Sequence, residues 1–222
     1  MAQKVKILMT EFVTHNVRRF ILEKPKDLSW TPGQGTDVAL GTPKTKDDWH
    51  PFTPTSLPDD GVLEYTIKGY PKRQGLTNEL HRLAPGAELL IGDSFGDIRY
   101  KGRGVFIAGG AGITPFLAIL RQLSRQGGLE GNSLIFSNKT WADIIQEREL
   151  RSYLGDRCIF TLTQEPRAGY ENRKVDVEFL KAHIDDFGQF FYVCGPKRFL
   201  LGTNEALRTL GAKAEQLVFD EP

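Results

Sequence analysis

The segment Gly109–Pro115, which reads Gly-Gly-Ala-Gly-Ile-Thr-Pro, is the part of this chain best suited to bind a charged ligand. A short apolar run, Val105–Ala108, precedes it, and apolar residues recur at helical spacing over 116–123. This pattern predicts a buried strand, a tight bend and an amphipathic helix, with Thr114 as N-cap and Pro115 in the first turn. Backbone N–H groups at such a bend attract phosphate, so we expect an anion site, although an ordinary tight connection has the same pattern. The glycines concerned are Gly109, Gly110 and Gly112.

The elements around this bend belong to a half of the chain in which strands and helices alternate. From Gly104 onward, further strands are expected at 133–137, 159–163, 190–194 and 216–219, and helices at 141–154, 176–184 and 199–210. Thr140 and Asp143 have the spacing of a capping box at the start of the helix over 141–154. Such alternation is typical of a doubly wound parallel sheet.

Residues 1 to about 100 lack this alternation. Short strands are expected at 5–8, 17–23, 37–40 and 63–68, with a polar loop over 41–48 and a short helix over 78–83. Their spacing indicates a small antiparallel barrel or sandwich. We therefore predict a β-barrel domain over 1–101 followed by an α/β doubly wound parallel-sheet domain over 102–222.

Composition narrows the class of protein. The chain has 222 residues, of which 40% are hydrophobic and 26% charged, with a formal net charge of +1, so nothing favours nucleic acid or an anionic membrane as a partner. Neither a signal peptide nor an apolar run of about 20 residues is evident, and we expect a cytoplasmic protein. The two cysteines, Cys158 and Cys194, are too few for a four-thiolate iron–sulfur cluster, and we expect no metal site.

With these two halves in this order, the chain resembles the ferredoxin/flavodoxin–NAD(P)H reductases, which pair a flavin-binding β-barrel with a nicotinamide-binding domain. The resemblance covers nearly the whole chain. It rests on six segments in the family's order: Pro32-Gly33-Gln34, His50-Pro51-Phe52-Thr53, Gly75-Leu76-Thr77, Gly92-Asp93-Ser94-Phe95-Gly96 as the turn closing the barrel, Gly109–Pro115, and Cys194-Gly195-Pro196.

The resemblance implies that the barrel binds FAD. Phe52 would stack on the flavin ring and the Thr53 hydroxyl would face flavin N5, while packing in the barrel core and an ordinary strand threonine are the alternatives. Thr77 and the helix start after it would bind the pyrophosphate, or Thr77 is an ordinary N-cap. The residues assigned to the flavin are His50, Pro51, Phe52, Thr53, Gly75, Leu76 and Thr77.

His50 stands where the family has arginine, and a neutral histidine cannot form a bidentate contact with phosphate. Flavin binding would then be weaker, or another cation would replace the arginine; FAD versus FMN stays open. The candidate cations are Lys68, Lys72 and Arg73.

On the nicotinamide side, the family pattern places the coenzyme pyrophosphate at the glycine bend and Thr114. Cys194 would lie beside the nicotinamide and, with Thr53, form the catalytic pair, although a buried thiol at a strand end is commonly a small hydrophobe. Ser137 and Lys139 end the second strand, where no acid is present to select NADH, so NADPH is slightly favoured over NADH. Gly195, Pro196 and a terminal aromatic shield, Phe219, complete the predicted site, with Arg167 or Arg173 as further phosphate ligands.

The function that the resemblance implies is hydride transfer from NAD(P)H to FAD, followed by electron transfer to a separate acceptor. Ferredoxin or flavodoxin is the expected partner, with a ferric chelate, a quinone or free flavin as alternatives. A basic docking patch or simply a solvated surface would be formed by Lys72, Arg73, Arg82, Lys101 and Arg103. The other hypothesis is a non-enzymatic nucleotide-binding or regulatory module that has lost tight flavin binding.

Overall fold

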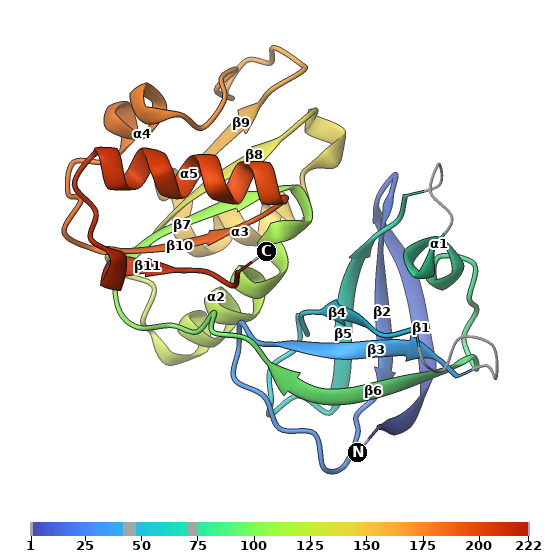
Figure 1. Cartoon of the computed structure of the whole chain (residues 1–222). Helices are drawn as coiled ribbons and strands as arrows, with labels where there is room; N and C mark the ends of the chain where they lie inside the picture. The colour runs from blue at the N-terminus through green and yellow to red at the C-terminus, as the bar shows by residue number, and fades with distance from the viewer. Residues whose placement is uncertain (1, 42–47, 71–74, 222) are drawn as a thin grey trace.

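The computed structural model describes residues 2–41, 48–70 and 75–221, and places two sheets side by side (Figure 1). The first is an antiparallel sheet of six strands in the order β4-β3-β6-β1-β2-β5. A bridge between Pro54 and Tyr65 joins the segment after β4 to β5, which brings the two ends of the sheet together as a barrel. The strands are β1 (Gln3–Thr14), β2 (Val17–Glu23), β3 (Gly35–Leu40), β4 (His50–Phe52), β5 (Val62–Lys68) and β6 (Glu88–Phe95).

The barrel core is built from the alternating side chains of these strands and from one short helix, α1 (Leu76–Leu80). On β5, Leu63, Tyr65 and Ile67 point into this core. Glu64 and Thr66 point the other way, yet they are only 8% and 4% exposed, because the second half of the chain packs on the outer face of β5. β5 is therefore buried on both faces, whereas an antiparallel sheet commonly leaves one face exposed to solvent.

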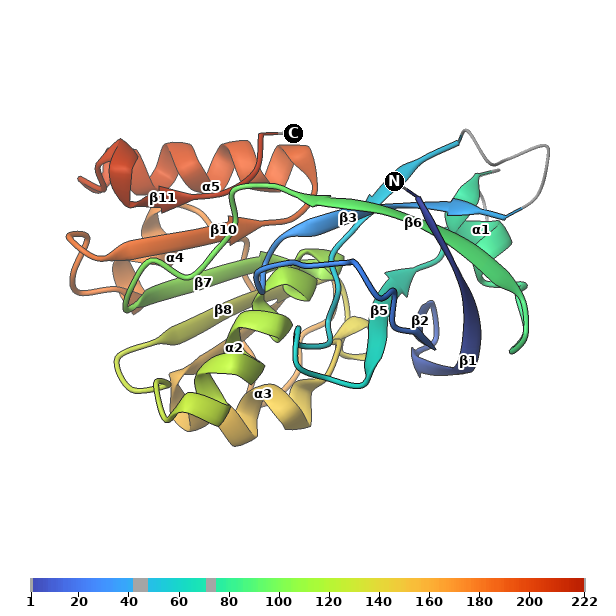
Figure 2. The ribbon, with the colours of Figure 1, turned by 90° about the horizontal axis from the view of Figure 1, so that it is seen from below.

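The second half is a parallel sheet in the order β11-β10-β7-β8-β9, with helices on both faces. α2 and α3 cover one face and α4 and α5 the other (Figure 2). The strands are β7 (Gly104–Gly109), β8 (Ser133–Asn138), β9 (Cys158–Leu162), β10 (Phe190–Cys194) and β11 (Leu217–Val218). The helices are α2 (Thr114–Gln126), α3 (Glu147–Leu154), α4 (Val177–His183) and α5 (Lys197–Thr209).

The predicted fold class is thus confirmed, whereas several local predictions are wrong. Thr114 is not an N-cap: a 3-10 turn over Gly110–Ile113 precedes α2, and the Thr114 hydroxyl donates back to the Ala111 carbonyl at 3.1 Å. The expected helix over 141–154 is split, because Gln146 adopts a left-handed conformation (φ 54°) between a 3-10 turn and α3. The capping box of Thr140 and Asp143 does form, on that 3-10 turn.

Two further differences concern the barrel. β4 and β6 were not expected as strands, since β4 has three residues with a proline in the middle and β6 includes Gly92–Phe95, which the sequence assigned to a turn. The turn begins at Gly96 instead, where φ is 99°. Most of the polar loop over 41–48, together with Lys72 and Arg73, lies outside the described residues. The boundary between 101 and 102 stays a prediction.

Candidate functional site

A pocket of about 220 Å³ lies where the two halves of the chain meet. Its barrel wall comes from the end of β4, the end of β5 and the start of α1. Its other wall comes from the second half of the chain, from the glycine bend and the first residue of α2. The lining residues are Pro51, Phe52, Thr53, Thr66, Ile67, Lys68, Tyr70, Thr77, Ala111 and Thr114.

The barrel wall carries hydroxyl groups and one cation. Thr53 follows Phe52 at the end of β4, where Phe52 pairs with Thr36 of β3 and remains half-buried against the barrel core. Lys68 ends β5, and its Nζ lies 3.5 Å from Oδ1 of Asp143, a residue of the other half of the chain. Its side chain is 19% exposed, so a cation is held at the edge of the pocket by a carboxylate across the domain boundary.

Other residues assigned to the flavin lie differently. His50 does not line the pocket; its Nε2 is 3.1 Å from Oδ1 of Asp48, and its side chain is 43% exposed. Leu76 is buried in the barrel core, so its side chain stabilises α1 rather than facing a ligand. Gly75 precedes α1 and Thr77 lines the pocket. The structure therefore brings Pro51, Phe52, Thr53 and Thr77 together, and leaves His50 and the Leu76 side chain outside.

The glycine bend and the Cys194-Gly195-Pro196 segment lie against each other at the carboxyl ends of β7 and β10. A Cβ on Gly112 would lie 2.3 Å from the Cys194 carbonyl oxygen, and one on Gly195 would lie 3.2 Å from Gly109 Cα. Gly110 has φ 54° and would place a Cβ in open space. Glycine is thus needed at 112 for close backbone contact and at 110 for the turn, and the open space beside Gly110 leaves its backbone accessible to a ligand.

Cys194 is half-buried and packs against the core beneath α2. Burial, with a smaller contribution from the Asp220 carboxylate, raises the pKa of its thiol to about 12. The thiol is therefore protonated at physiological pH, which argues against a nucleophilic role and suits a neutral side chain beside a bound ring.

The residues expected to select the coenzyme lie around the ends of β8 and β9. Ser137 is the penultimate residue of β8, and Lys139 follows the strand on the exposed surface. The Arg167 guanidinium lies 4.2 Å from the Trp141 ring centroid, and Glu165 accepts the Trp141 backbone N–H at 2.7 Å. Arg173 lies 4.0 Å from Asp176, which caps α4. Arg167 and Arg173 are thus already engaged, whereas Glu165 brings an acid to this edge that the sequence analysis missed because it follows the neighbouring strand.

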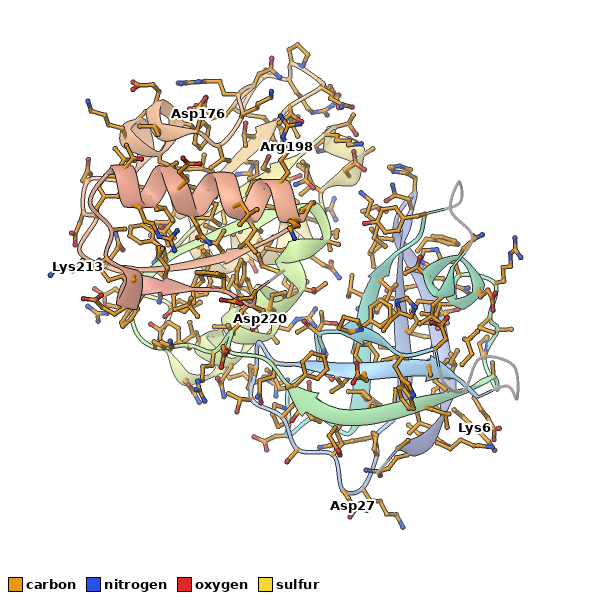
Figure 3. The ribbon with its side chains drawn as sticks, viewed as in Figure 1. Lys6, Asp27, Asp176, Arg198, Lys213 and Asp220 are labelled. Carbon is orange, nitrogen blue, oxygen red and sulfur yellow. The ribbon has the colours of Figure 1, made fainter. Side chains whose placement is uncertain are left out.

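Among the described residues of the C-terminal segment, Phe219 and Asp220 do not line the pocket. Phe219 packs against the core beneath α4 and α5, on the face of the sheet opposite α2. Asp220 instead lies on the side of the sheet that faces the barrel (Figure 3), and its Oδ1 accepts the backbone N–H groups of Asp97 at 2.6 Å and Ile98 at 3.3 Å. The segment therefore ties the end of the chain to the connection between the two halves. Pro196, the remaining predicted residue, precedes α5 on the surface.

Two of the five cations of the expected basic patch, Lys72 and Arg73, lie outside the described residues. Arg103 lies at the amino end of β7, where its side chain approaches Gly131, and Lys101 is two residues before it. This edge is opposite the glycine bend, whereas Arg82 follows α1 on the barrel. The docking patch therefore stays a prediction.

The arrangement fits a flavin in the pocket and a dinucleotide at the bend. The barrel wall offers hydroxyl donors and acceptors beside the Phe52 ring and the Lys68 cation, which suits a polar aromatic ring system and its phosphates. The bend offers open backbone at Gly110, and its 3-10 turn leads directly into α2, which suits a pyrophosphate.

Comparison with known proteins agrees with this division. The FAD-binding domain family matches residues 2–90, and the oxidoreductase NAD-binding domain family matches residues 106–205. NADH-cytochrome b5 reductase 1 of Coccidioides immitis is 30% identical over 230 residues, which cover 93% of this chain and 74% of that protein.

Solved structures share the fold. The flavohem-like FAD/NAD-binding domain of nitric oxide dioxygenase from Vibrio cholerae superposes with a TM-score of 0.86 at 18% identity, covering 98% of this chain and 97% of that one. A ferredoxin NADP+ reductase from Neisseria gonorrhoeae, with bound FAD and NADP, superposes with a TM-score of 0.84 at 19% identity and the same coverage. At these identities the likeness establishes the fold.

Proposed function

We propose, from the premise that this chain belongs to the ferredoxin–NAD(P)H reductase family and is an NAD(P)H-dependent flavin oxidoreductase, that NADH is its electron donor and a haem protein of the cytochrome b5 class its acceptor. The observation that carries the proposal is the pocket between the two halves, where Thr53 and Lys68 of the barrel face Thr114 at the start of α2. A redox cofactor held by one wall would meet a coenzyme held by the other.

The acceptor is proposed from the relatives. The Coccidioides immitis protein named as an NADH-cytochrome b5 reductase is similar to 93% of this chain, at 30% identity. The ferredoxin reductase from Neisseria gonorrhoeae is less similar in sequence, at 19% identity. These observations favour the haem protein over ferredoxin or flavodoxin.

The coenzyme is proposed from charge. NADPH requires cations for its 2′-phosphate. Lys139 is exposed after β8, but Arg173 lies beside Asp176 and Arg167 lies over Trp141. The carboxylate of Glu165 lies at the same edge, 3.7 Å from the Arg167 guanidinium, so it offsets that positive charge, and an acid there accepts hydrogen bonds from ribose hydroxyls. NADH is therefore the better match.

Each part of the chain has a distinct task in this mechanism. Bound FAD supplies the hydride-accepting and one-electron chemistry. Thr53, Thr66 and Thr77 would hold its polar edges by hydrogen bonds, and Phe52 would pack against its ring. Gly110 and Gly112 would hold the coenzyme pyrophosphate through backbone N–H groups. Cys194 would present a protonated thiol beside the nicotinamide and help to exclude water.

The deciding experiment is anaerobic reduction of the FAD-reconstituted protein, followed at the visible flavin band. NADH is expected to bleach the band faster than NADPH, and the reduced protein is expected to reduce cytochrome b5 faster than ferredoxin or flavodoxin. A protein that does not retain FAD, or a band that neither coenzyme bleaches, would support the nucleotide-binding module instead. Faster reduction of ferredoxin or flavodoxin would show that the acceptor is wrong while the reductase activity stands.

A further inference from the structure

Arg121 joins the two halves of the chain outside the pocket. It lies on α2, seven residues after Thr114, and its side chain is only 16% exposed. Its Nη1 donates to the Thr55 carbonyl at 2.6 Å and to Glu64 Oε1 at 2.7 Å, both in the barrel. Its Nε and Nη2 donate to the two carboxylate oxygens of Glu149 on α3, at 2.6 and 2.9 Å. One guanidinium therefore joins α2 and α3 to the barrel.

The hydrogen bonds continue from Arg121 to the wall of the pocket. The Thr55 hydroxyl donates to Glu64 Oε1 at 2.7 Å and lies 3.2 Å from the Thr66 hydroxyl. Thr66 lines the pocket, and Thr55 is two residues after Thr53, which also lines it. The connection from α2 to the flavin side of the pocket is thus an unbroken series of hydrogen bonds, which we call the Arg121 network: Glu149, Arg121, Glu64, Thr55 and Thr66.

The charges of this network are paired. Arg121 lies between the carboxylates of Glu64 and Glu149, and Arg19, which pairs with Glu11 at 2.6 Å, lies 3.8 Å from Glu64 Oε2. Although burial by itself would raise it, the pKa of Glu149 is lowered by the Arg121 guanidinium. Buried charges are costly unless they are paired and hydrogen-bonded, so a network of this kind holds its groups in one geometry.

We propose that Arg121 is a positioning residue for hydride transfer. It fixes the glycine bend before α2 relative to the wall of the pocket that carries Thr53 and Thr66. This inference rests on the proposed function, because it assigns the two walls to the two redox partners. Hydride transfer requires the reacting atoms within about 3–3.5 Å, and an error of about 1 Å can lower the rate about 100-fold. A rigid link between the walls therefore affects the rate of transfer more than the affinity for either partner.

The chain offers a matched control for this test. Arg125, one turn further along α2, also binds across to the barrel, with Nη2 2.7 Å from Asp60 Oδ1. Its side chain is 59% exposed, and its described contacts do not continue to the pocket. Arg125→Met therefore removes a cation and an ion pair between the same two halves while leaving the Arg121 network in place.

The experiment is stopped-flow reduction of FAD-loaded protein by NADH and by NADH deuterated at C4. In Arg121→Met we expect the limiting rate per bound flavin to fall about 100-fold, the isotope effect to persist and the Kd for NADH to change less than about threefold. Arg121→Lys would recover part of the rate, since the lysine ammonium can pair with one carboxylate but cannot bind Glu149 bidentately and reach Glu64 at the same time. Arg125→Met is expected to stay within about twofold of the unchanged protein.

A second readout uses the cofactor-free protein. The Thr55 backbone N–H donates to the Glu64 carbonyl at 2.7 Å, so its hydrogen exchange reports on the wall itself. Exchange at Thr55 should become at least about tenfold faster in Arg121→Met and remain unchanged in Arg125→Met. If Arg121→Met does not fold, Glu64→Gln, which keeps the side-chain size, is expected to slow transfer about tenfold.

The outcomes separate this inference from the proposed function. Flavin that NADH does not reduce even in the unchanged protein would overturn the proposed function and this inference with it. Reduction of the unchanged protein, together with an unchanged rate in Arg121→Met or Glu64→Gln, would overturn the positioning role alone. Equal slowing in Arg121→Met and Arg125→Met would also overturn it, because any loss of contact between the halves would then suffice.

Discussion

Gly112 and Cys194 are in backbone contact, although 82 positions separate their numbers: a Cβ added to Gly112 would lie 2.3 Å from the Cys194 carbonyl oxygen and 2.4 Å from its carbonyl carbon. This contact joins the bend after β7 to the end of β10, the strand that pairs with β7 over Gly104–Ala108. The two segments that the resemblance assigned to the coenzyme therefore form one surface.

Gly112→Ala should disrupt that surface. The clash is with backbone rather than with the end of a flexible side chain, so we expect a loss of about 1–3 kcal/mol in the free energy of unfolding and weaker NADH binding. Urea unfolding and NADH titration measure the two effects. Gly202→Ala in α5 is the matched control, because a Cβ there meets nothing within 4 Å and alanine favours a helix by about 1 kcal/mol. Equal stability of Gly112→Ala and the unchanged protein would contradict the contact.

The Cys194 thiol should react slowly with alkylating reagents. Because burial raises its pKa to about 12, the alkylation rate should rise about tenfold per pH unit between pH 7 and 10. Asp220→Asn removes a nearby negative charge, which should lower this pKa and speed alkylation at a given pH. The thiol of Cys158, whose pKa burial also raises to about 12, serves as the internal reference and should be unaffected by Asp220→Asn. Mass spectrometry after timed alkylation gives both rates, and a fast Cys194 at pH 7 would refute the assignment.

Stability should fall at mildly acidic pH through His81. Its Nε2 donates to the Ile67 carbonyl at 2.8 Å, but burial, together with the Arg18 charge, lowers its pKa below the usual 6.5. The folded state thus prefers neutral His81, so its contribution is complete above pH 6.5 and is lost as the pH falls through the lowered pKa. In His81→Gln the amide can still donate to Ile67, and the free energy of unfolding should decline less between pH 7 and 5. Parallel declines in both proteins would exclude His81 as the cause.

Restoring the family's arginine at position 50 should strengthen flavin binding. His50 is partly exposed and its Nε2 contacts Asp48, whereas arginine would bring a permanent charge and a bidentate donor to the same strand. One charge-assisted hydrogen bond contributes about 1.5–3 kcal/mol, so the Kd of His50→Arg for FAD should fall about tenfold or more. Fluorescence titration with FAD measures the change, with His50→Gln expected within about twofold of the unchanged protein. An unchanged Kd in His50→Arg would show that a cation at this position, which lies outside the pocket in the structure, does not reach the flavin.

Elements with a strong local pattern were predicted well. β2 and β10 have the predicted bounds, because their apolar residues and flanking turns are local signals. Thr114 and Gln146 show where local rules fail. A 3-10 turn begins four residues before Thr114 and uses its hydroxyl differently, and Gln146 adopts a left-handed conformation that no residue type in that stretch indicates.

Local motifs in the sequence likewise identified some of the pocket residues and missed others. Thr53, Thr77 and Thr114 were found from short motifs, whereas Thr66 and Tyr70 carry no motif and became pocket residues only when β5 packed beside α2. Their roles toward a flavin or coenzyme remain predictions.

By itself, the sequence determined the order of a β-rich half and an alternating α/β half, the glycine bend and the resemblance to a flavin reductase, because these depend on residues close together along the chain. Only the tertiary structure decided how the halves meet. Arg121 binds residues 57, 66 and 28 positions away, and its contact helps to explain the burial of Glu64, a charge in the middle of a strand. Pairing between such distant residues depends on the packed arrangement of both halves, and a local pattern does not encode it.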